Sequence, residues 1–276
     1  MYEELLKTAQ TDSEGFERLQ RVIEILRAPG GCPWDRAQTH ESLTRGMVEE
    51  AYEVVQAIEN HDRDNLIEEL GDVLLQVVMH AQIASEEGSF TMKDICNREA
   101  EKMIFRHPHV FGPKAENSKD SQGLSVDNVL DLWENIKEVE KSETSATASM
   151  QKIPRHLPAL LRSEKVQKKA ARVGFDWPDV SGAFQKLDEE SAELKEAYQQ
   201  GDQEHIKEEL GDLLFAITNI SRFLGIDPED ALNATSNKFI RRFAYVESAA
   251  MAQGRRPEDM TLSEMDTLWE EAKTKL

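Results

Sequence analysis

The sequence predicts an all-α protein built from a duplicated helical module. Three observations favour this fold class. Long windows of the 276-residue chain carry apolar residues at the helical period of about 3.6, patterns that alternate as in strands are almost absent, and five motifs occur twice in the same order. We therefore expect a tandem repeat of modules of the four-helix type.

Helices are expected where apolar periodicity is bounded by Gly, Pro, Asn or Asp. In the first half they fall near 14–28, 41–60, 63–87, 91–106 and 125–141, and in the second half near 158–173, 180–200, 202–224, 228–250 and 261–275. Two polar segments, 112–123 and 141–152, are expected to be linkers, the second because it is rich in Ser, Thr and Ala. The expected domains are 1–140 and 153–276, with the linker 141–152 between them.

The composition excludes several classes of protein. The net charge is −20, whereas a protein that binds a nucleic-acid backbone nonspecifically needs an excess of Lys and Arg. No apolar run approaches the ~20 residues of a membrane span, and the first residues do not resemble a signal peptide. Cys32 and Cys96 are too few for a disulfide framework. We therefore expect a cytoplasmic protein without a nucleic-acid or membrane partner.

The repeated motifs lie about half the chain apart. The acidic segment "VEEAYEV" (48–54) is echoed by "DEESAEL" (188–194), and "EELGDVLL" (68–75) is echoed by "EELGDLLF" (208–215). The other three pairs are "CPWD" (32–35) with "FDWPD" (175–179), "NREAEKMIFR" (97–106) with "NATSNKFIRR" (233–242), and "LDLWENIK" (130–137) with "DTLWEEAK" (266–273). Each copy thus supplies a Trp, two acidic pairs, a Lys/Arg pair and a second Trp.

One acidic pair in each copy interrupts a helix that is otherwise apolar. Apolar residues of the helix at 63–87 point in nearly every direction, yet Glu69, Asp72 and His80 share one stripe. Glu209 and Asp212 are the equivalent acids of the second copy, and Asn219 falls near the face of Asp212. Buried carboxylates without partners cost too much free energy, so they need cations or a metal ion.

The other acidic pair lies on the preceding helix. Glu50 and Glu53 flank the apolar stripe of 41–60, and Glu190 and Glu193 do the same in 180–200. Two antiparallel helices joined by a short turn would bring each E-x-x-E pair opposite an E-x-x-D pair. Four converging carboxylates offer the hard oxygen ligands that suit Mg²⁺ or Mn²⁺. No E-x-x-H occurs in these pairs, which argues against a di-iron bundle.

Two pairs of basic residues stand at i,i+4, namely Lys238 with Arg242 and Lys102 with Arg106. Alone, such a pair is usually part of a solvated face, but beside a metal-binding cluster it would hold phosphate oxygens. Lys186 precedes the first acid of its helix by four residues and is expected to point to the same site. Two tryptophans, for which core packing is the alternative role, are candidates for stacking on a base: Trp133 and Trp269.

The pattern E-E-x-x-E followed by E-x-x-D on paired helices resembles the all-α nucleoside triphosphate pyrophosphohydrolases. Three further segments carry the resemblance: "GGCPWDRAQTHESL" (30–43), "KMIFRHPHVFG" (102–112) and "RVGFDWPD" (172–179). It covers the chain from about residue 16 to residue 273. The resemblance implies Mg²⁺-dependent hydrolysis of ribo- and deoxyribonucleoside triphosphates of broad base range to monophosphate and pyrophosphate, with Mn²⁺ as a substitute, by a homodimer of intertwined helices.

The resemblance also implies roles for individual residues. The metal ligands and catalytic residues are Glu190, Glu193, Glu209 and Asp212, and the matching metal ligands of the first copy are Glu50, Glu53, Glu69 and Asp72. The substrate-binding residues are Lys186, Glu189, Glu208, Lys238, Arg241, Arg242 and Trp269, with Lys102, Arg106 and Trp133 in the first copy. Phe105 stands at the position of Arg241, which favours the second copy as the main catalytic site.

The mechanism expected of such an enzyme is attack of water on the α-phosphorus. Glu190 or Glu193 would orient or deprotonate that water, while charge on the leaving pyrophosphate is neutralised by metal and by basic residues. The main alternative is a non-catalytic module that binds metal and nucleotide or serves only dimer assembly. A missing carboxylate would favour that alternative, and none is missing in either copy.

Overall fold

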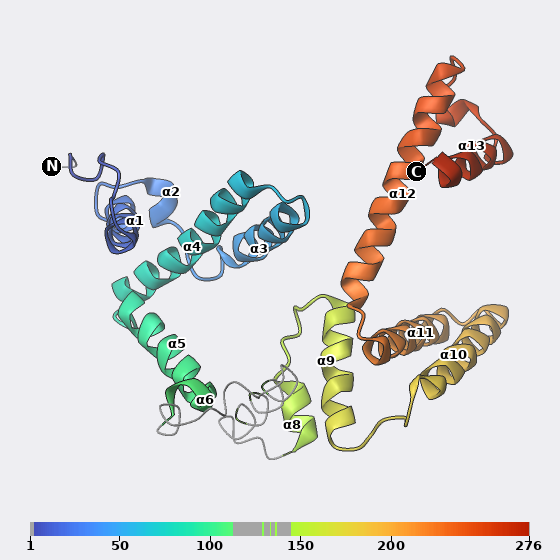
Figure 1. The fold of residues 1–276 in the computed structure, drawn as a ribbon, viewed down its shortest axis with the longest axis horizontal. Coiled ribbons are helices and arrows are strands. Elements are labelled where there is room, and N and C mark those ends of the chain that lie inside the picture. The colour runs from blue at the N-terminus through green and yellow to red at the C-terminus, as the bar shows by residue number, and fades with distance from the viewer. Residues whose placement is uncertain (1–2, 113–128, 130–132, 134–135, 137–144, 276) are drawn as a thin grey trace. The chain divides into compact units, whose positions relative to one another are not determined.

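The structure is a computed structural model that describes residues 3–112, 129, 133, 136 and 145–275 (Figure 1). It divides into two compact units, Met1–Lys137 and Glu138–Leu276. Throughout the described part of the chain every regular element is a helix, so the all-α prediction is confirmed. Apart from residues 129, 133 and 136, the expected helix at 125–141 lies outside the described residues, as does nearly all of the expected linker at 112–123. No helix in the described ranges is both long and apolar enough to cross a membrane.

The first unit contains a pair of helices, α3 and α4, and further helices pack against α4. Its elements are α1 (Asp12–Arg27), α2 (Pro33–Arg36), α3 (Thr44–Glu59), α4 (Arg63–Glu86), α5 (Met92–Arg106) and α6 (Pro108–Phe111). Helix α1 begins at a capping box, in which Thr11 and Glu14 satisfy each other's free backbone N–H groups. The core cluster lies where α1 and α5 meet the C-terminal half of α4, around Ile23, Val78 and Met92.

The second unit repeats the paired helices and adds a long arm. Its elements are α8 (Ala146–Gln151), α9 (Ala159–Arg172), α10 (Val180–Gln200), α11 (Gln203–Leu224), α12 (Pro228–Ala252), the 3₁₀ turn η3 (Pro257–Asp259) and α13 (Leu262–Lys275). Helices α10 and α11 form an antiparallel hairpin, and α9 packs against α11. Figure 1 shows α12 leaving this hairpin near α9, with α13 folded back on its far half.

Helix α8 lies within the segment 141–152, which the sequence indicates as a linker. The side chain of Ser145 caps the helix by accepting a hydrogen bond from the backbone N–H of Ala148. Ser149 and Ile153 are buried, and α8 packs against α9. A short helix therefore forms inside a segment that has few large apolar residues, because a cap and a neighbouring helix stabilise it.

Tight turns set the spacing of the paired helices. Gly201 ends α10 in the left-handed region at φ 76°, where a side chain would be strained, and Asp202 at once caps α11. Ala57 in α3 and Ala197 in α10 are almost fully buried, at 1% and 0% exposure. These small side chains allow α3 to approach α4, and α10 to approach α11, closely enough for carboxylates on facing helices to meet.

Candidate active site

The hairpin of α10 and α11 brings three of the four predicted acids of the second copy together. One carboxylate oxygen from each of Glu190, Glu193 and Glu209 lies within 4.8 Å of the other two. Glu190 is 4% exposed and Glu209 is 9% exposed, whereas Glu193 and Asp212 are exposed. The two helices thus supply acids from E-x-x-E and from E-x-x-D to one cluster, as the spacing predicts.

The first copy builds a similar cluster on α3 and α4. Carboxylate oxygens of Glu50, Glu69 and Asp72 lie within 4.8 Å of one another. Glu53 interacts with both Glu50 and Glu69, so all four predicted acids of this copy belong to one cluster. His80 does not join them: its Nδ1 lies 2.7 Å from Nδ1 of His40, and the two rings are stacked.

Loss of hydration and neighbouring negative charge raise the pKa of one acid in the second cluster and of two acids in the first. Loss of hydration raises the pKa of Glu193, and the charges of Glu190 and Glu209 raise it further. Loss of hydration likewise raises the pKa of Glu50 and of Glu69, with their acidic neighbours adding to the effect. A divalent cation at either cluster would relieve this repulsion, and carboxylate oxygens are the ligands that Mg²⁺ prefers.

Two basic side chains distinguish the second cluster from the first. Lys186 Nζ lies 2.5 Å from Glu190 and 2.9 Å from Glu189, and these carboxylates raise the pKa of Lys186. Nε2 of His205 lies 3.0 Å from Oε1 of Glu209. Lys186 is a residue that the sequence predicts at the site, whereas His205 is not among the predicted residues, although its i,i+4 spacing to Glu209 is the signal for this contact.

The corresponding positions of the first copy carry no basic group. Gly46 stands four residues before Glu50, and Asn65 stands four residues before Glu69. A Cβ atom at Gly46 would lie 2.8 Å from Nε2 of Gln76, which is the flexible end of that side chain on α4. The two clusters are therefore alike in their acids and different in the groups that compensate them.

The predicted phosphate-binding residues of the second copy lie on the arm formed by α12 and α13. The guanidinium carbon of Arg242 lies 6.0 Å from the centre of the Trp269 ring, and Phe239 packs against the same ring with centroids 4.9 Å apart. Lys238 and Arg241 are exposed on α12. Among the described residues, α12 packs mainly against α13, with smaller contacts to α9 and α11, and these contacts do not place its basic residues at the carboxylate cluster of the same chain. Figure 1 shows the arm directed away from α10.

The remaining predicted residues have local partners. Lys102 pairs with Glu99 on its own helix, Arg106 is buried and lies 5.5 Å from the centre of the Trp133 ring, and Glu208 is exposed. Arg106 and Trp133 therefore repeat in the first unit the contact that Arg242 and Trp269 make in the second. This shared contact supports the duplication at the level of tertiary structure.

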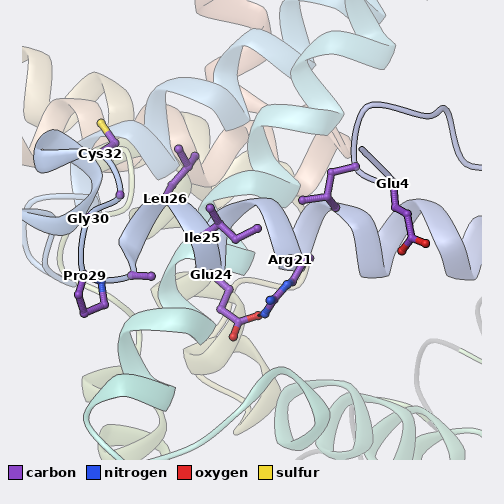
Figure 2. Close-up of a pocket in the computed structure, with 11 residues that line it drawn as sticks. Glu4, Arg21, Glu24, Ile25, Leu26, Pro29, Gly30 and Cys32 are labelled. Atoms are coloured by element: carbon purple, nitrogen blue, oxygen red, sulfur yellow. Dashed lines mark hydrogen bonds and ion pairs between the residues drawn. The ribbon is translucent and has the colours of Figure 1, made fainter. Parts of the chain in front are cut away.

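A separate cavity of about 830 Å³ lies between the N-terminal segment, α1 and the loop that follows it (Figure 2). Its wall includes Glu4, Arg21 and Glu24, and the last two form an ion pair with each other. None of the residues that line this cavity belongs to the predicted site. The volume of this cavity therefore does not identify it as the active site, and the carboxylate clusters remain the candidate active sites.

Comparisons with known proteins agree with the duplicated site. A family model described as the MazG nucleotide pyrophosphohydrolase domain matches residues 38–111 and 181–246. The chain is 46% identical over 258 residues to the nucleoside triphosphate pyrophosphohydrolase/pyrophosphatase MazG of Thermotoga maritima, covering 94% of this chain and 95% of the relative. It is 42% identical over 264 residues to the nucleoside triphosphate pyrophosphohydrolase of Escherichia coli K12, covering 94% and 97%. A relative in Bacillus subtilis, the uncharacterized protein YabN, is 48% identical over 259 residues, which are 94% of this chain and 51% of YabN.

Proposed function

This chain belongs to the MazG family of nucleotide pyrophosphohydrolases, and from that premise we propose that it hydrolyses nucleoside triphosphates to monophosphate and pyrophosphate. The proposal extends to Mg²⁺ as the cofactor, with Mn²⁺ as a substitute, and to ribo- and deoxyribonucleotides of broad base range. The observation that carries it is the meeting of Glu190, Glu193 and Glu209 on facing helices.

The chemistry of the second cluster fits a divalent metal ion. Glu190 and Glu209 are buried acids that contact Lys186 and His205, respectively. Asp212, one helical turn beyond Glu209, would complete the set of ligands. Bound Mg²⁺ would neutralise triphosphate oxygens and so favour departure of pyrophosphate.

The protein's own side chains then have separate tasks. Glu193 is the exposed member of the cluster, so its carboxylate can reach solvent, orient a water molecule and accept its proton. Lys186 is held beside Glu190 and would move its ammonium group to a phosphate oxygen once the carboxylate binds metal. His205 keeps Glu209 in place through the contact between Nε2 and Oε1.

We also propose that the active enzyme is a homodimer. Helix α12 exposes large apolar side chains, including Phe239 (55%), Ile240 (63%) and Leu232 (55%), and such surfaces are usually covered by a partner. The same helix carries Lys238 and Arg242, which lie apart from the carboxylates of their own chain. A second copy that covers α12 would allow these cations to reach the triphosphate at the partner's carboxylates.

The test of the proposed function is a panel of nucleoside triphosphates incubated with the protein and Mg²⁺. We expect equal amounts of monophosphate and pyrophosphate, and no diphosphate or orthophosphate, because attack at the α-phosphorus releases the terminal phosphates together. Chelation of Mg²⁺ should stop the release and added Mn²⁺ should restore part of it. If the protein bound triphosphates but hydrolysed none of those in the panel, the non-catalytic alternative would be favoured.

A further inference from the structure

Two histidines of the first unit bring their Nδ1 atoms to 2.7 Å from each other. His80 lies in the C-terminal half of α4, about two helical turns beyond Asp72, and His40 lies in the loop between α2 and α3. The planes of the two rings differ by only 6°. The pair therefore joins the loop that leads into α3 to α4, and the proposed hydrolysis leaves both imidazoles without a role.

The loop that carries His40 is held by hydrogen bonds of its own. Thr39 and Ser42 exchange two of them, because the backbone N–H of each residue donates to the side-chain oxygen of the other, at 2.9 and 3.2 Å. Arg27 donates a further hydrogen bond of 3.2 Å to the backbone oxygen of Gln38. Bonds before and after His40 thus fix the backbone from which its imidazole reaches α4.

The protons of the pair leave lone pairs directed at one point. A hydrogen bond between two neutral imidazoles needs one Nδ1 that carries a proton and one that does not. The carboxylate of Glu87 lies 3.9 Å from Nε2 of His40 and favours a proton on that nitrogen, so the Nδ1 of His40 keeps its lone pair. A shift of the His80 proton from Nδ1 to Nε2 would free a second lone pair. Burial lowers the pKa of His80, and the charge of His40 lowers it further, which favours the neutral imidazole that binds metal.

Two neutral imidazole nitrogens that converge in this way suit a transition metal ion. Imidazole is a ligand for Zn²⁺, Ni²⁺ and Cu²⁺, whereas Mg²⁺ takes oxygen ligands. In a tetrahedral site with Zn–N distances of about 2.0–2.1 Å, two ligand nitrogens lie about 3.3 Å apart. The pair would open by about 0.6 Å from its 2.7 Å, which small rotations of the two side chains supply. The side chain of His40 is 34% exposed, so water can complete the coordination.

The second copy does not repeat this pair. At the spacing that relates Glu50 to Glu190, the positions equivalent to the two histidines are Val180 and Ile220. Their side chains carry no atom that binds a metal ion. The acids are therefore duplicated and the imidazoles are not, which separates the pair from the chemistry that the two carboxylate clusters share.

We propose that His40 and His80 bind one transition metal ion of the Zn²⁺ type through their Nδ1 atoms, with water in the remaining positions. Glu87 would accept a hydrogen bond from Nε2 of His40, and a carboxylate on the outer N–H of a ligating histidine is the usual support for such a ligand. The bound ion would tie the loop before α3 to α4 and so stabilise the first unit. The site is distinct from the carboxylate clusters and does not depend on the proposed hydrolysis.

Calorimetric titration of the full chain with Zn²⁺ tests the site, with excess Mg²⁺ present to occupy the carboxylate clusters. His40→Ala and His80→Ala should each weaken the binding of one Zn²⁺ by more than about 100-fold, and Glu87→Gln should weaken it by about 10-fold, the scale for a group that supports a ligand. His156→Ala, which removes an exposed histidine, is the matched control and should bind Zn²⁺ as the wild type does. Zn²⁺ affinity that is the same in His40→Ala as in the wild type overturns the inference, and so does a wild-type protein that binds no Zn²⁺.

Electron paramagnetic resonance with Cu²⁺ as the probe identifies the ligand atoms. The wild-type spectrum should show hyperfine coupling to two imidazole nitrogens, and the spectrum of His40→Ala should lose one of them. His40 lies in a loop, so this variant decides the test even if His80→Ala does not fold, and circular dichroism checks the fold. Zn²⁺ should also raise the melting temperature of the wild type and not that of His40→Ala. Coupling to two nitrogens that persists in His40→Ala would contradict the inference.

Discussion

At the scale of single residues, the site is defined by carboxylates that crowd together on facing helices. Glu193 meets Glu190 and Glu209, and its pKa is raised above the ordinary value of 4.5. The folded protein therefore holds more protons than the unfolded chain between these two pKa values. Its stability without metal falls as the pH rises through this window, and the penalty is complete above the folded pKa.

Replacement of this acid should separate stability from metal binding. At pH 7 without metal, Glu193→Gln should raise the melting temperature, because it removes one of three crowded charges. The same variant should lose most of the further rise that Mg²⁺ gives to the wild-type protein. Calorimetry with and without Mg²⁺ at pH 7 checks both effects. Repeated without metal at pH 4, it should show a smaller increase in melting temperature from the substitution, because Glu193 is then largely protonated in the wild-type protein. Glu196→Gln, one turn away and exposed, should behave as wild type.

The positions of the acidic residues could be predicted from the sequence, whereas most contacts between side chains of different elements could not. Duplication and helical spacing indicated the carboxylates on α3, α4, α10 and α11, because side chains three or four residues apart share a face. The hydrogen bond that Gln167 donates to the backbone oxygen of Phe215 depends on how α9 packs against α11, which no spacing in one helix reveals. The pairing of His80 with His40 depends in the same way on contact between α4 and a loop.

At the scale of elements, a buried arginine joins four parts of the first unit. The side chain of Arg27, at the end of α1, is 5% exposed and forms two hydrogen bonds with Glu86 on α4, of 3.0 and 2.8 Å. It also donates to the backbone oxygens of Asp35 in α2 and Gln38 in the loop before α3. The hydrogen bond from Arg27 lowers the pKa of Glu86. This arginine therefore helps to fix the frame on which α3 and α4 present their acids.

Arg27→Met should destabilise the first unit by about 2–3 kcal/mol. This is less than the ~3–5 kcal/mol for a broken buried pair, because the side chain of Glu86 is 38% exposed and recovers part of its hydration. Urea unfolding measures the loss, and Arg21→Met, which breaks an exposed pair, should change stability by under about 0.5 kcal/mol. Because the folded pKa of Glu86 is depressed, the stabilisation should be present above its ordinary value of 4.5 and lost as the pH falls below it.

The element boundaries followed from sequence where caps and periodicity agree. Helix α10 was expected at 180–200 and occupies Val180–Gln200, because Asp179 caps its start and Gly201 ends it. The direction of α12 could not be predicted in this way. Helix α12 has 25 residues and carries apolar side chains on several faces, as a buried helix does. This pattern is the same whether the covering surface belongs to the same chain or to a second chain.

At the scale of the whole molecule, the separation of acids and cations predicts that two copies share each site. Glu209→Gln should abolish hydrolysis by loss of a metal ligand, and Lys238→Ala should lower it strongly by loss of a phosphate contact. Co-expression of the two variants should restore a substantial part of the activity, because mixed dimers contain one site with intact acids and an intact Lys238. Purified dimers of each single variant are the controls, and activity that stays at their level would contradict a shared site.

The proposed hydrolysis depends most on the acids of the second carboxylate cluster, and one measurement tests their role most directly. Pyrophosphate release with saturating Mg²⁺ is compared among wild type, Glu69→Gln, Glu209→Gln and the double variant, after circular dichroism shows that each is folded. We predict that Glu209→Gln lowers the rate of pyrophosphate release by at least about 100-fold, the scale for removal of one charge-stabilising group. Glu69→Gln should keep most of the wild-type rate. A wild-type rate in the double variant would contradict the account, because the acids of neither copy would then perform the chemistry.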